Sequence, residues 1–263
     1  MQAYPSDLIQ KKAKGEKITI LTAYDAPTAA LIATQNIDAI LVGDSLANVI
    51  AGLDTTLSVT LDQMIYHTQM VKRGAPTALI LTDMPYLSYT NETEAIHNAT
   101  RLLKEGGAAG VKIEATHHHL PIITALINHG IPVLSHVGFT PQYLFQLGGY
   151  KIQGKTEEAA QQLKSLCRDL EKTSSFGIVL EMIPSSLAKT ISKSIKIPTI
   201  GIGAGPHCDG QILVTSDLLG LSDKKVPKFV KPYATLYPQM QKAISKFKDD
   251  VEKGQFPDDS HSF

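Results

Sequence analysis

The sequence predicts a (β/α)8 barrel of the α/β class, in which eight parallel strands close on themselves and alternate with helices. Short runs rich in Val, Ile and Leu alternate with amphipathic stretches of helical length. The runs are continuously apolar, as expected of strands that are buried on both faces. They recur about every 25–30 residues on average, which matches the βα repeat of a barrel of about 250 residues.

A further observation concerns how the strand-like runs end. Several lead into an ionisable residue instead of a turn residue, namely Asp44, Asp83, Glu114, His136 and Glu181. The carboxyl ends of parallel strands meet at one edge of a sheet, and in a closed barrel they meet at one rim. The pattern therefore predicts a polar functional site at that rim. An open doubly wound sheet is the competing architecture.

The expected elements follow in chain order. The strands are Ile18–Thr22, Ala39–Gly43, Ala78–Thr82, Gly110–Glu114, Pro132–His136, Gly177–Glu181, Pro198–Ile202 and, more weakly, Gln211–Thr215. Helical apolar spacing, often after a Ser, Thr or Asp start, marks Asp25–Gln35, Leu61–Arg73, Glu92–Glu105, Leu120–Asn128, Glu157–Lys172 and Ser185–Ser194. Extra helices are expected over Ser6–Lys14 and Tyr233–Val251. Residues 1–263 are expected to form a single barrel domain.

The composition is that of an ordinary globular protein with a substantial core. Of the 263 residues, 43% are apolar and 19% are charged, and 25 basic residues balance 25 acidic ones. A net charge of zero gives no global reason to bind nucleic acid or an anionic membrane. The N-terminus lacks the apolar core of a secretory signal, and no window approaches the roughly 20 apolar residues of a membrane span. We therefore expect a cytoplasmic protein with neither kind of partner.

Five residues near the rim indicate binding of a metal and a substrate. Asp44, followed by Ser45, and Asp83 come after the second and third predicted strands. A carboxylate there can hold a hard metal ion and a Ser hydroxyl can hold a substrate carboxylate, although either aspartate could equally cap a helix. Lys112 lies two residues before Glu114, so the two share one face of a strand. Burying them together is costly unless they pair or meet a ligand.

His136 and Glu181 end the fifth and sixth predicted strands. With the residues above, they would place four carboxylates, a lysine and a histidine at one rim. Clustered like charges repel one another, and a divalent cation resolves that repulsion. Oxygen ligands without cysteine favour Mg²⁺ over zinc or copper.

Two other motifs are weaker candidates. His117, His118 and His119 are adjacent, so in a helix their side chains point about 100° apart and cannot converge on one ion. A polar loop or a first helical turn is expected there. The run GIGAGPHCDG (201–210) lacks the spacing of a dinucleotide fingerprint and has no Walker lysine. Its glycines are expected to let the backbone approach the site closely, and an anion or cofactor contact there stays open.

Several motifs together resemble the ketopantoate hydroxymethyltransferase family, in order from about Thr22 to the C-terminal HSF. They are VGDS (42–45), TTLSVTLDQMIYHTQMVKRGAP (55–76), DMP (83–85), VKIE (111–114), IPVLSHVGFTPQ (131–142), GGYKIQGK (148–155), VLEMIP (179–184), IPTIGIGAG (197–205) and DGQILV (209–214). The chain departs from the family pattern at Ala47 and Asn48, at Ser135, and in THHHLP (116–121). None of these changes removes an acid, a base or a metal ligand.

The resemblance implies a barrel of the phosphoenolpyruvate/pyruvate type that acts in pantothenate biosynthesis. Such an enzyme would transfer a hydroxymethyl group from 5,10-methylenetetrahydrofolate to 3-methyl-2-oxobutanoate through a Mg²⁺-stabilised enolate, giving 2-dehydropantoate and tetrahydrofolate. At the matching positions, the resemblance implies three groups of residues. Asp44, Asp83 and Glu114 would bind the metal; Asp44, Ser45, Asp83 and Lys112 would contact the keto acid; Glu181 would be the general base and His136 a supporting residue. Homo-oligomers, often decamers, are implied as well.

Two other functions stay open from the sequence. Another Mg²⁺-dependent C–C lyase or mutase on the same barrel would share the metal carboxylates. A barrel that has lost catalysis could serve as an assembly protein, although the intact set of acidic and basic residues argues against it.

Overall fold

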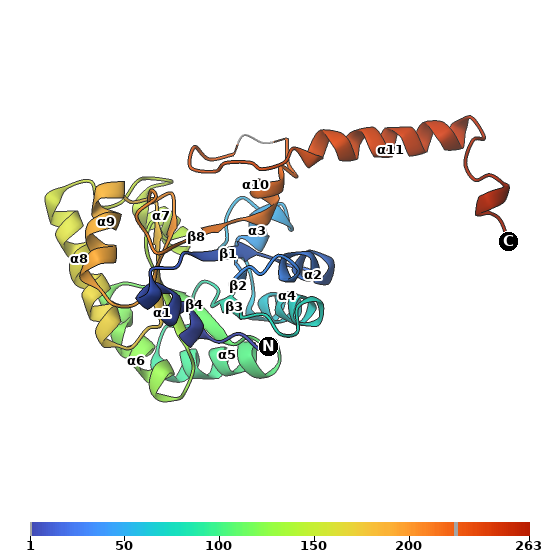
Figure 1. Cartoon of the computed structure of the whole chain (residues 1–263). Coiled ribbons are helices and arrows are strands. Elements are labelled where there is room, and N and C mark those ends of the chain that lie inside the picture. The colour runs from blue at the N-terminus through green and yellow to red at the C-terminus, as the bar shows by residue number, and fades with distance from the viewer. Residues whose placement is uncertain (1, 224–225) are drawn as a thin grey trace. The chain divides into compact units, whose positions relative to one another are not determined.

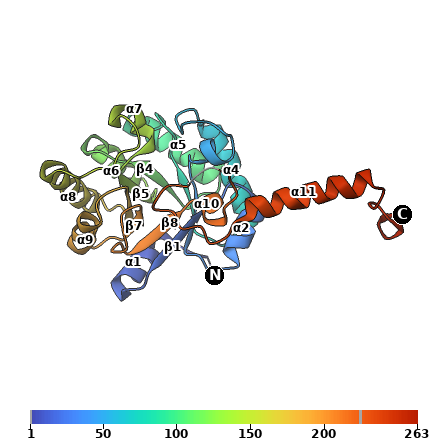
Figure 2. The same cartoon turned by 90° about the horizontal axis from the view of Figure 1, so that it is seen from above.

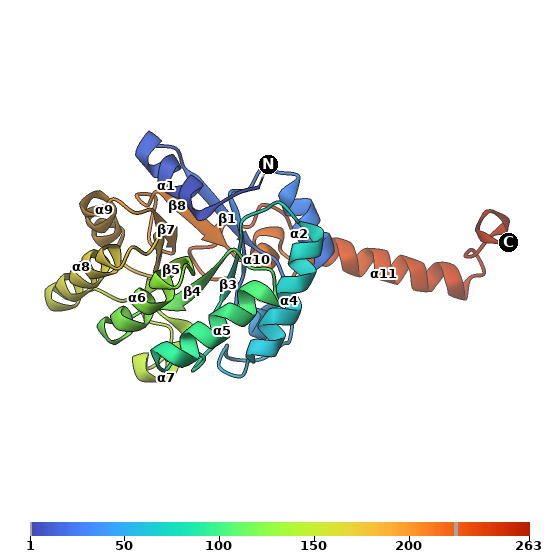
Figure 3. The ribbon, with the colours of Figure 1, turned by 90° about the horizontal axis from the view of Figure 1, so that it is seen from below.

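The computed structural model describes residues 2–223 and 226–263 of the chain. Eight parallel strands form a closed barrel in chain order, and the last strand pairs with the first. Helices cover the outside of the strands, as the view of the whole chain and the view from below show (Figures 1 and 3). The predicted (β/α)8 barrel is therefore confirmed, and the open doubly wound sheet is wrong.

The strands lie close to their predicted positions. They are β1 (Ile18–Thr22), β2 (Ala39–Val42), β3 (Ile80–Asp83), β4 (Gly110–Glu114), β5 (Val133–Gly138), β6 (Gly177–Glu181), β7 (Thr199–Ile202) and β8 (Gly210–Leu213). Their parallel pairing brings the carboxyl ends of all eight to one rim, which is the arrangement that the acidic strand ends predicted.

The helices of the barrel follow the expected order, and two short ones, over Leu46–Val49 and Leu144–Leu147, were not expected. They are α1 (Pro5–Lys14), α2 (Ala26–Ala33), α3 (Leu46–Val49), α4 (Leu61–Gly74), α5 (Glu92–Lys104), α6 (Leu120–Asn128), α7 (Leu144–Leu147), α8 (Glu157–Lys172) and α9 (Ser185–Ser194). Single 3₁₀ turns, η1 (His117–His119) and η2 (Pro141–Tyr143), follow β4 and β5. Seen from above, α5, α6, α8 and α9 surround the strands (Figure 2).

The two faces of each strand pack against different partners. Leu81, Leu134 and Val179 belong to an apolar cluster that the strands build among themselves, so these side chains point into the barrel. Two residues further along the same strands, and hence on the same face, come Asp83, His136 and Glu181. The barrel interior is therefore apolar toward the start of the strands and ionisable at their carboxyl ends. Because every second residue of a strand points inward, the alternation determines which residues form the site.

The last strand begins and ends earlier than predicted. Expected over Gln211–Thr215, β8 runs over Gly210–Leu213 instead, and Thr215 begins a helix. Gly210 lies opposite Ile18 of β1, where an added Cβ would come within 2.5 Å of the Ile18 carbonyl oxygen. A glycine is needed there because the backbones of the first and last strands approach each other closely. Gly210, which the sequence placed at the end of a glycine-rich loop, therefore belongs to the strand that closes the barrel.

The chain divides into two compact units, Met1–Val214 with the barrel and Thr215–Phe263. The second unit contains α10 (Thr215–Leu219), α11 (Leu236–Glu252) and the 3₁₀ turn η3 (Asp259–His261). The expected helix from Tyr233 begins at Leu236 instead, because Pro238 lacks an N–H and is tolerated only in a first turn. The single domain expected over residues 1–263 stays a prediction. Among the described residues, no helix is both long enough and apolar enough to cross a membrane.

Candidate active site

Asp44 and Asp83 lie side by side at the rim. Asp83 ends β3, and its Oδ2 accepts a hydrogen bond of 3.0 Å from the backbone N–H of Asp44, just beyond β2. Both side chains are buried. The helices that follow start at other residues, because Ser45 occupies the N-cap position of α3 and Asn91 caps α5. The helix-cap interpretation of the two aspartates is therefore wrong.

Lys112 pairs across the strands and not along its own strand. Its Nζ lies 2.8 Å from Asp83 Oδ1, and the two residues are direct neighbours in the β3–β4 register. Glu114, which shares the inward face with Lys112, is held from another direction: its Oε2 accepts a hydrogen bond of 3.0 Å from the backbone N–H of Gln142. The buried ion pair considered for Lys112 exists, but its partner is Asp83.

His136 lies between the lysine and the remaining carboxylate. Its Nδ1 is 3.4 Å from Lys112 Nζ and 3.7 Å from Glu114 Oε1, and its Nε2 is 3.2 Å from Glu181 Oε2. Burial, and then the charge of Lys112, lower the pKa of His136 well below its usual value, so the ring is neutral. His136 thus contacts both halves of the site.

Ser45 is oriented by a residue that the sequence did not single out. Tyr24, just after β1, places its hydroxyl 2.8 Å from Ser45 Oγ. Burial raises the pKa of Tyr24 to about 12, so the phenol keeps its proton and remains able to donate. The expectation that Ser45 lies at the rim beside Asp44 agrees with this position.

Gln142 is the main site residue that the sequence did not reveal. Its side-chain Nε2 donates to Asp44 Oδ2 and to the carbonyl of Met84, both at 2.9 Å, and its Oε1 accepts a 2.6 Å bond from Tyr89. With the backbone bond to Glu114, it connects the carboxylates of two strands. Two signals pointed to it: it ends the family motif IPVLSHVGFTPQ (131–142), and it lies six residues after His136, next to Pro141.

Burial sets the protonation of the site. It raises the pKa of Asp44 to about 7, with Asp83 adding to the effect, and it raises the pKa of Glu181 to about 8. Burial and the charge of Asp44 hold the pKa of Glu114 well above its usual value. Burial disfavours the Lys112 ammonium as well, but the neighbouring carboxylates outweigh it and raise that pKa. One ammonium cannot balance four carboxylates, so the site suits an additional cation.

The oxygen donors fit Mg²⁺ better than a metal that needs a complete protein cage. Glu114 Oε1 and Asp83 Oδ1 are buried without a hydrogen bond, since the Lys112 contact to Asp83 is an ion pair without hydrogen-bond alignment. Among the described residues, no three His, Cys, Asp or Glu side chains converge as a ready-made metal cluster. Mg²⁺ commonly takes one or two carboxylates and completes its shell with water and substrate oxygens.

The two weaker motifs have other roles in the structure. His117–His119 form η1, the expected first helical turn. The Nδ1 atom of His119 accepts a hydrogen bond of 3.0 Å from the backbone N–H of Thr116. The hydroxyl oxygen of Tyr143 lies 3.3 Å from Nε2 of the same ring. In the glycine-rich run, Gly205 has a positive φ of 79°, and an added Cβ would lie 2.2 Å from Ser185 Oγ. That glycine allows the loop to approach the start of α9, so its role is close backbone packing.

A closed parallel barrel with buried carboxylates at its C-terminal rim places the chain among the (β/α)8-barrel enzymes. Solved structures with this fold include 2,3-dimethylmalate lyase, at 16% identity and a TM-score of 0.61, covering 100% of this chain and 93% of that one. Phosphoenolpyruvate phosphomutase from Streptomyces platensis has 11% identity and a TM-score of 0.64, covering 95% and 88%. The sequence model of ketopantoate hydroxymethyltransferase matches residues 3–259, and the chain belongs to that family.

Relatives over nearly the whole chain carry one name. A protein from Geobacter metallireducens called 3-methyl-2-oxobutanoate hydroxymethyltransferase is 50% identical over 258 residues, covering 98% of this chain and 97% of its own. A protein of the same name from Clostridium botulinum is 52% identical over 253 residues, covering 96% and 92%. The family resemblance that the motifs indicated is confirmed.

Proposed function

We propose that this enzyme transfers a hydroxymethyl group from 5,10-methylenetetrahydrofolate to 3-methyl-2-oxobutanoate, giving 2-dehydropantoate and tetrahydrofolate in pantothenate biosynthesis. The names of the full-length relatives support the activity. One arrangement above all supports the chemistry: the partly buried Glu181 carboxylate lies across His136 from the Lys112–Asp83 ion pair. A base and a positively charged oxygen-binding group thus stand at one rim, as proton removal beside a carbonyl requires.

The keto acid would bind between β2, β3 and β4. Asp44, Asp83 and Glu114 would hold Mg²⁺, directly or through water, and the bound ion would stabilise negative charge on the keto oxygen. Lys112 adds positive charge beside the same oxygens. Ser45, held by the Tyr24 hydroxyl, would donate to the substrate carboxylate.

Glu181 would remove the proton from C3 of the keto acid. The resulting enolate carbon forms a bond to the methylene carbon of the donor. Over the whole reaction, that carbon also gains the oxygen of one water molecule and loses both of its bonds to nitrogen. The C3 proton and one proton of the water end on the two nitrogens of tetrahydrofolate, which balances the transfer.

Two measurements on the unmodified enzyme test this activity. With Mg²⁺, the enzyme should exchange the C3 proton of 3-methyl-2-oxobutanoate in D₂O, and chelation of the metal should abolish the exchange. With 5,10-methylenetetrahydrofolate added, 2-dehydropantoate should accumulate. Exchange without this product would favour a lyase or mutase, and absence of both would favour a non-catalytic assembly protein.

We further propose that the protein is a cytoplasmic homo-oligomer, a decamer by family resemblance. Helix α11 supports self-association, because Met240, Ile244, Phe247 and Val251 are exposed along one face at helical spacing. An apolar stripe of this kind is normally covered in a native assembly.

A further inference from the structure

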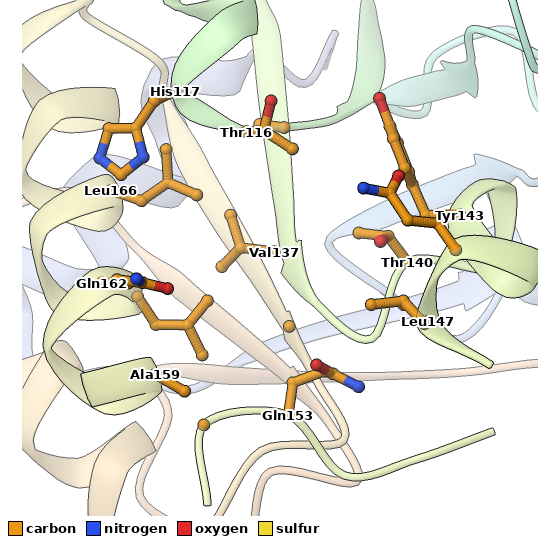
Figure 4. A pocket seen from close by; sticks show the side chains of 15 residues that line it. Thr116, His117, Val137, Thr140, Tyr143, Leu147, Gln153, Ala159, Gln162 and Leu166 are labelled. Carbon is orange, nitrogen blue, oxygen red and sulfur yellow. The ribbon is translucent and has the colours of Figure 1, made fainter. Parts of the chain in front are cut away.

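A cavity of about 280 Å³ lies between the ends of β4 and β5 and helix α8 (Figure 4). Apolar side chains such as Val137 and Leu166 line one part of it. The amides of Gln153 and Gln162 and the hydroxyl of Thr140 line another, and Figure 4 shows the Gln162 amide on the α8 side. None of the described lining residues is a carboxylate, a lysine or an arginine, and the one histidine, His117, lies 3.6 Å from Asp169, which is outside the cavity lining. The cavity therefore suits a neutral ligand that has both apolar faces and hydrogen-bonding edges.

Two backbone hydrogen bonds join segments at or next to the cavity to the end of β6, where Glu181 lies. The backbone N–H of Gln153, a lining residue, donates to the Met182 carbonyl at 2.9 Å, and the N–H of Phe139 donates to the Glu181 carbonyl at 2.8 Å. Met182 has a left-handed φ of 46°, a conformation that persists in a non-glycine residue only where its surroundings hold it. A ligand in the cavity would lie beside a rigid part of the backbone next to Glu181.

A second hollow of about 250 Å³ adjoins the first and differs from it in charge. Gly154 lines both, and the second also contains Lys155, Lys164 and Glu157. Lys164 Nζ is 3.9 Å from Glu157, a long contact, and Lys155 has no ion pair within the described part of the chain. The second hollow is thus open to an anionic group.

Gly154, the lining residue that the two hollows share, lies where no side chain fits. Its φ is +72°, and an added Cβ would lie 2.6 Å from Leu187 and 2.9 Å from Leu163. Any side chain at this position would strain the backbone and displace both leucines. Because both hollows share this residue, one elongated ligand that extends past Gly154 would contact both.

We propose that the neutral cavity binds the pterin ring of the folate donor and that Lys155 and Lys164 bind its glutamate tail. The proposal rests on the proposed function, in which this donor brings the methylene carbon to the enolate. A pterin is flat and presents amide-like donors and acceptors that glutamine side chains can match. A cavity of about 280 Å³ lies just below the range for drug-sized ligands, so it would take one ring system and leave the tail outside.

The first test fills the cavity. Ala159 of α8 lines it, and A159W should raise the KM for 5,10-methylenetetrahydrofolate and the Kd for tetrahydrofolate at least about tenfold. Metal-dependent exchange of the keto acid proton should be unchanged, because that step needs no donor. The matched control is Q161W on the same helix, which lies outside the cavity and should change neither value. Unchanged donor binding in a folded A159W protein would overturn the proposal.

The second test separates ring from tail and does not depend on tolerance of a large side chain. Q162L should weaken tetrahydrofolate and 6-methyltetrahydropterin alike, by up to about tenfold for one lost hydrogen bond. K155Q and K164Q should weaken tetrahydrofolate by about two- to fivefold, as for exposed ion pairs, and leave the tail-free pterin unchanged. If Q162L affects neither ligand, the cavity does not bind the pterin.

The outcomes also distinguish this proposal from the proposed function. If the unmodified enzyme exchanges the proton and forms product while A159W and Q162L bind tetrahydrofolate normally, only the donor site is wrong. If the unmodified enzyme forms no product with the donor, the proposed function itself is wrong.

Discussion

The hydrogen on His136 can be placed from its neighbours. Lys112 is a donor only, so the ring nitrogen that faces it, Nδ1, accepts, and Nε2 carries the hydrogen. Nε2 lies 3.2 Å from Glu181 Oε2, without hydrogen-bond alignment. A neutral ring in this tautomer can stabilise the Glu181 carboxylate but cannot take a proton at Nε2. The proton from the substrate would therefore go to Glu181, and His136 supports the base, which extends the minor role expected for it from the sequence.

Glu181→Gln tests the base directly. The amide is nearly isosteric and cannot accept the C3 proton, so exchange in D₂O should slow roughly 10²–10⁴-fold, the usual loss when a general base is removed. Binding of the keto acid should persist, because the proposed contacts of the substrate lie elsewhere. The exposed Glu158→Gln is the control, and an exchange rate in Glu181→Gln equal to that of the control would exclude Glu181 as the base.

The rate should depend on pH through the same group. Burial raises the pKa of Glu181 from 4.5 to about 8, and a general base works only when deprotonated. The rate should rise with pH through the pKa of Glu181 and be lost as the carboxylate gains a proton. A bound cation lowers that pKa. The apparent pKa of the acid limb of kcat/KM should therefore lie between 4.5 and about 8. A limb at or below 4.5 would show that the base is not a buried carboxyl.

Gln142→Leu tests how far the metal site depends on a residue that holds a proposed metal ligand, Asp44, in place. The change removes the bonds to Asp44 and Tyr89 while keeping a similar volume. Loss of such outer contacts typically weakens a metal site 10–100-fold, so the Mg²⁺ requirement for exchange should shift by about that factor. The distant Gln161→Leu should leave the requirement unchanged, and an unchanged requirement in Gln142→Leu would mean that Asp44 needs no such support.

At the scale of elements, α1 closes the end of the barrel opposite the site. The backbone N–H of Ala3 donates to the Thr77 carbonyl shortly before β3, and Lys12 Nζ donates to the Ile197 carbonyl shortly before β7. Leu8, between them, joins the apolar cluster inside the barrel. The helix therefore covers the apolar interior at the N-terminal ends of the strands, and we expect it to stabilise the folded barrel.

Leu8→Ala should destabilise the protein without altering the chemistry. Leu8 is 2% exposed, and truncating a fully buried leucine costs about 2–5 kcal/mol of unfolding free energy. The neighbouring Ile9→Ala, at 39% exposure, should cost much less. Chemical denaturation measures both, and proton exchange by the folded fraction should match the unmodified enzyme. Equal stability of the two variants would show that α1 does not close the interior.

At the scale of the whole molecule, the exposed stripe on α11 makes self-association testable. Phe247→Asp places a charge in the middle of the stripe, where burial against a second copy would leave that charge desolvated. The mass measured by light scattering should fall, whereas Lys242→Asp on another face of the helix should leave it unchanged. An unaltered mass in Phe247→Asp would show that α11 does not contribute to assembly.

Most of the architecture follows from local properties of the sequence. Apolar runs such as Gly110–Glu114 and Gly177–Glu181 coincide with β4 and β6 because a strand that is buried on both faces needs continuous hydrophobicity wherever it lies. The strand expected over Gln211–Thr215 is present as β8 but starts at Gly210, where the chain must approach β1 closely. That approach depends on the closure of the barrel, which no local pattern describes.

The sequence by itself determined the barrel and the residues at its rim, since strand period and the parallel direction bring Asp83, Lys112 and Glu181 to one place. Only the tertiary structure decided which of them touch. Lys112 pairs with Asp83 because of the register between β3 and β4. Gln142 reaches Asp44, 98 positions away, because the chain turns back over the rim after β5. Contacts between separate strands and loops depend on register and closure, which are properties of the assembled barrel.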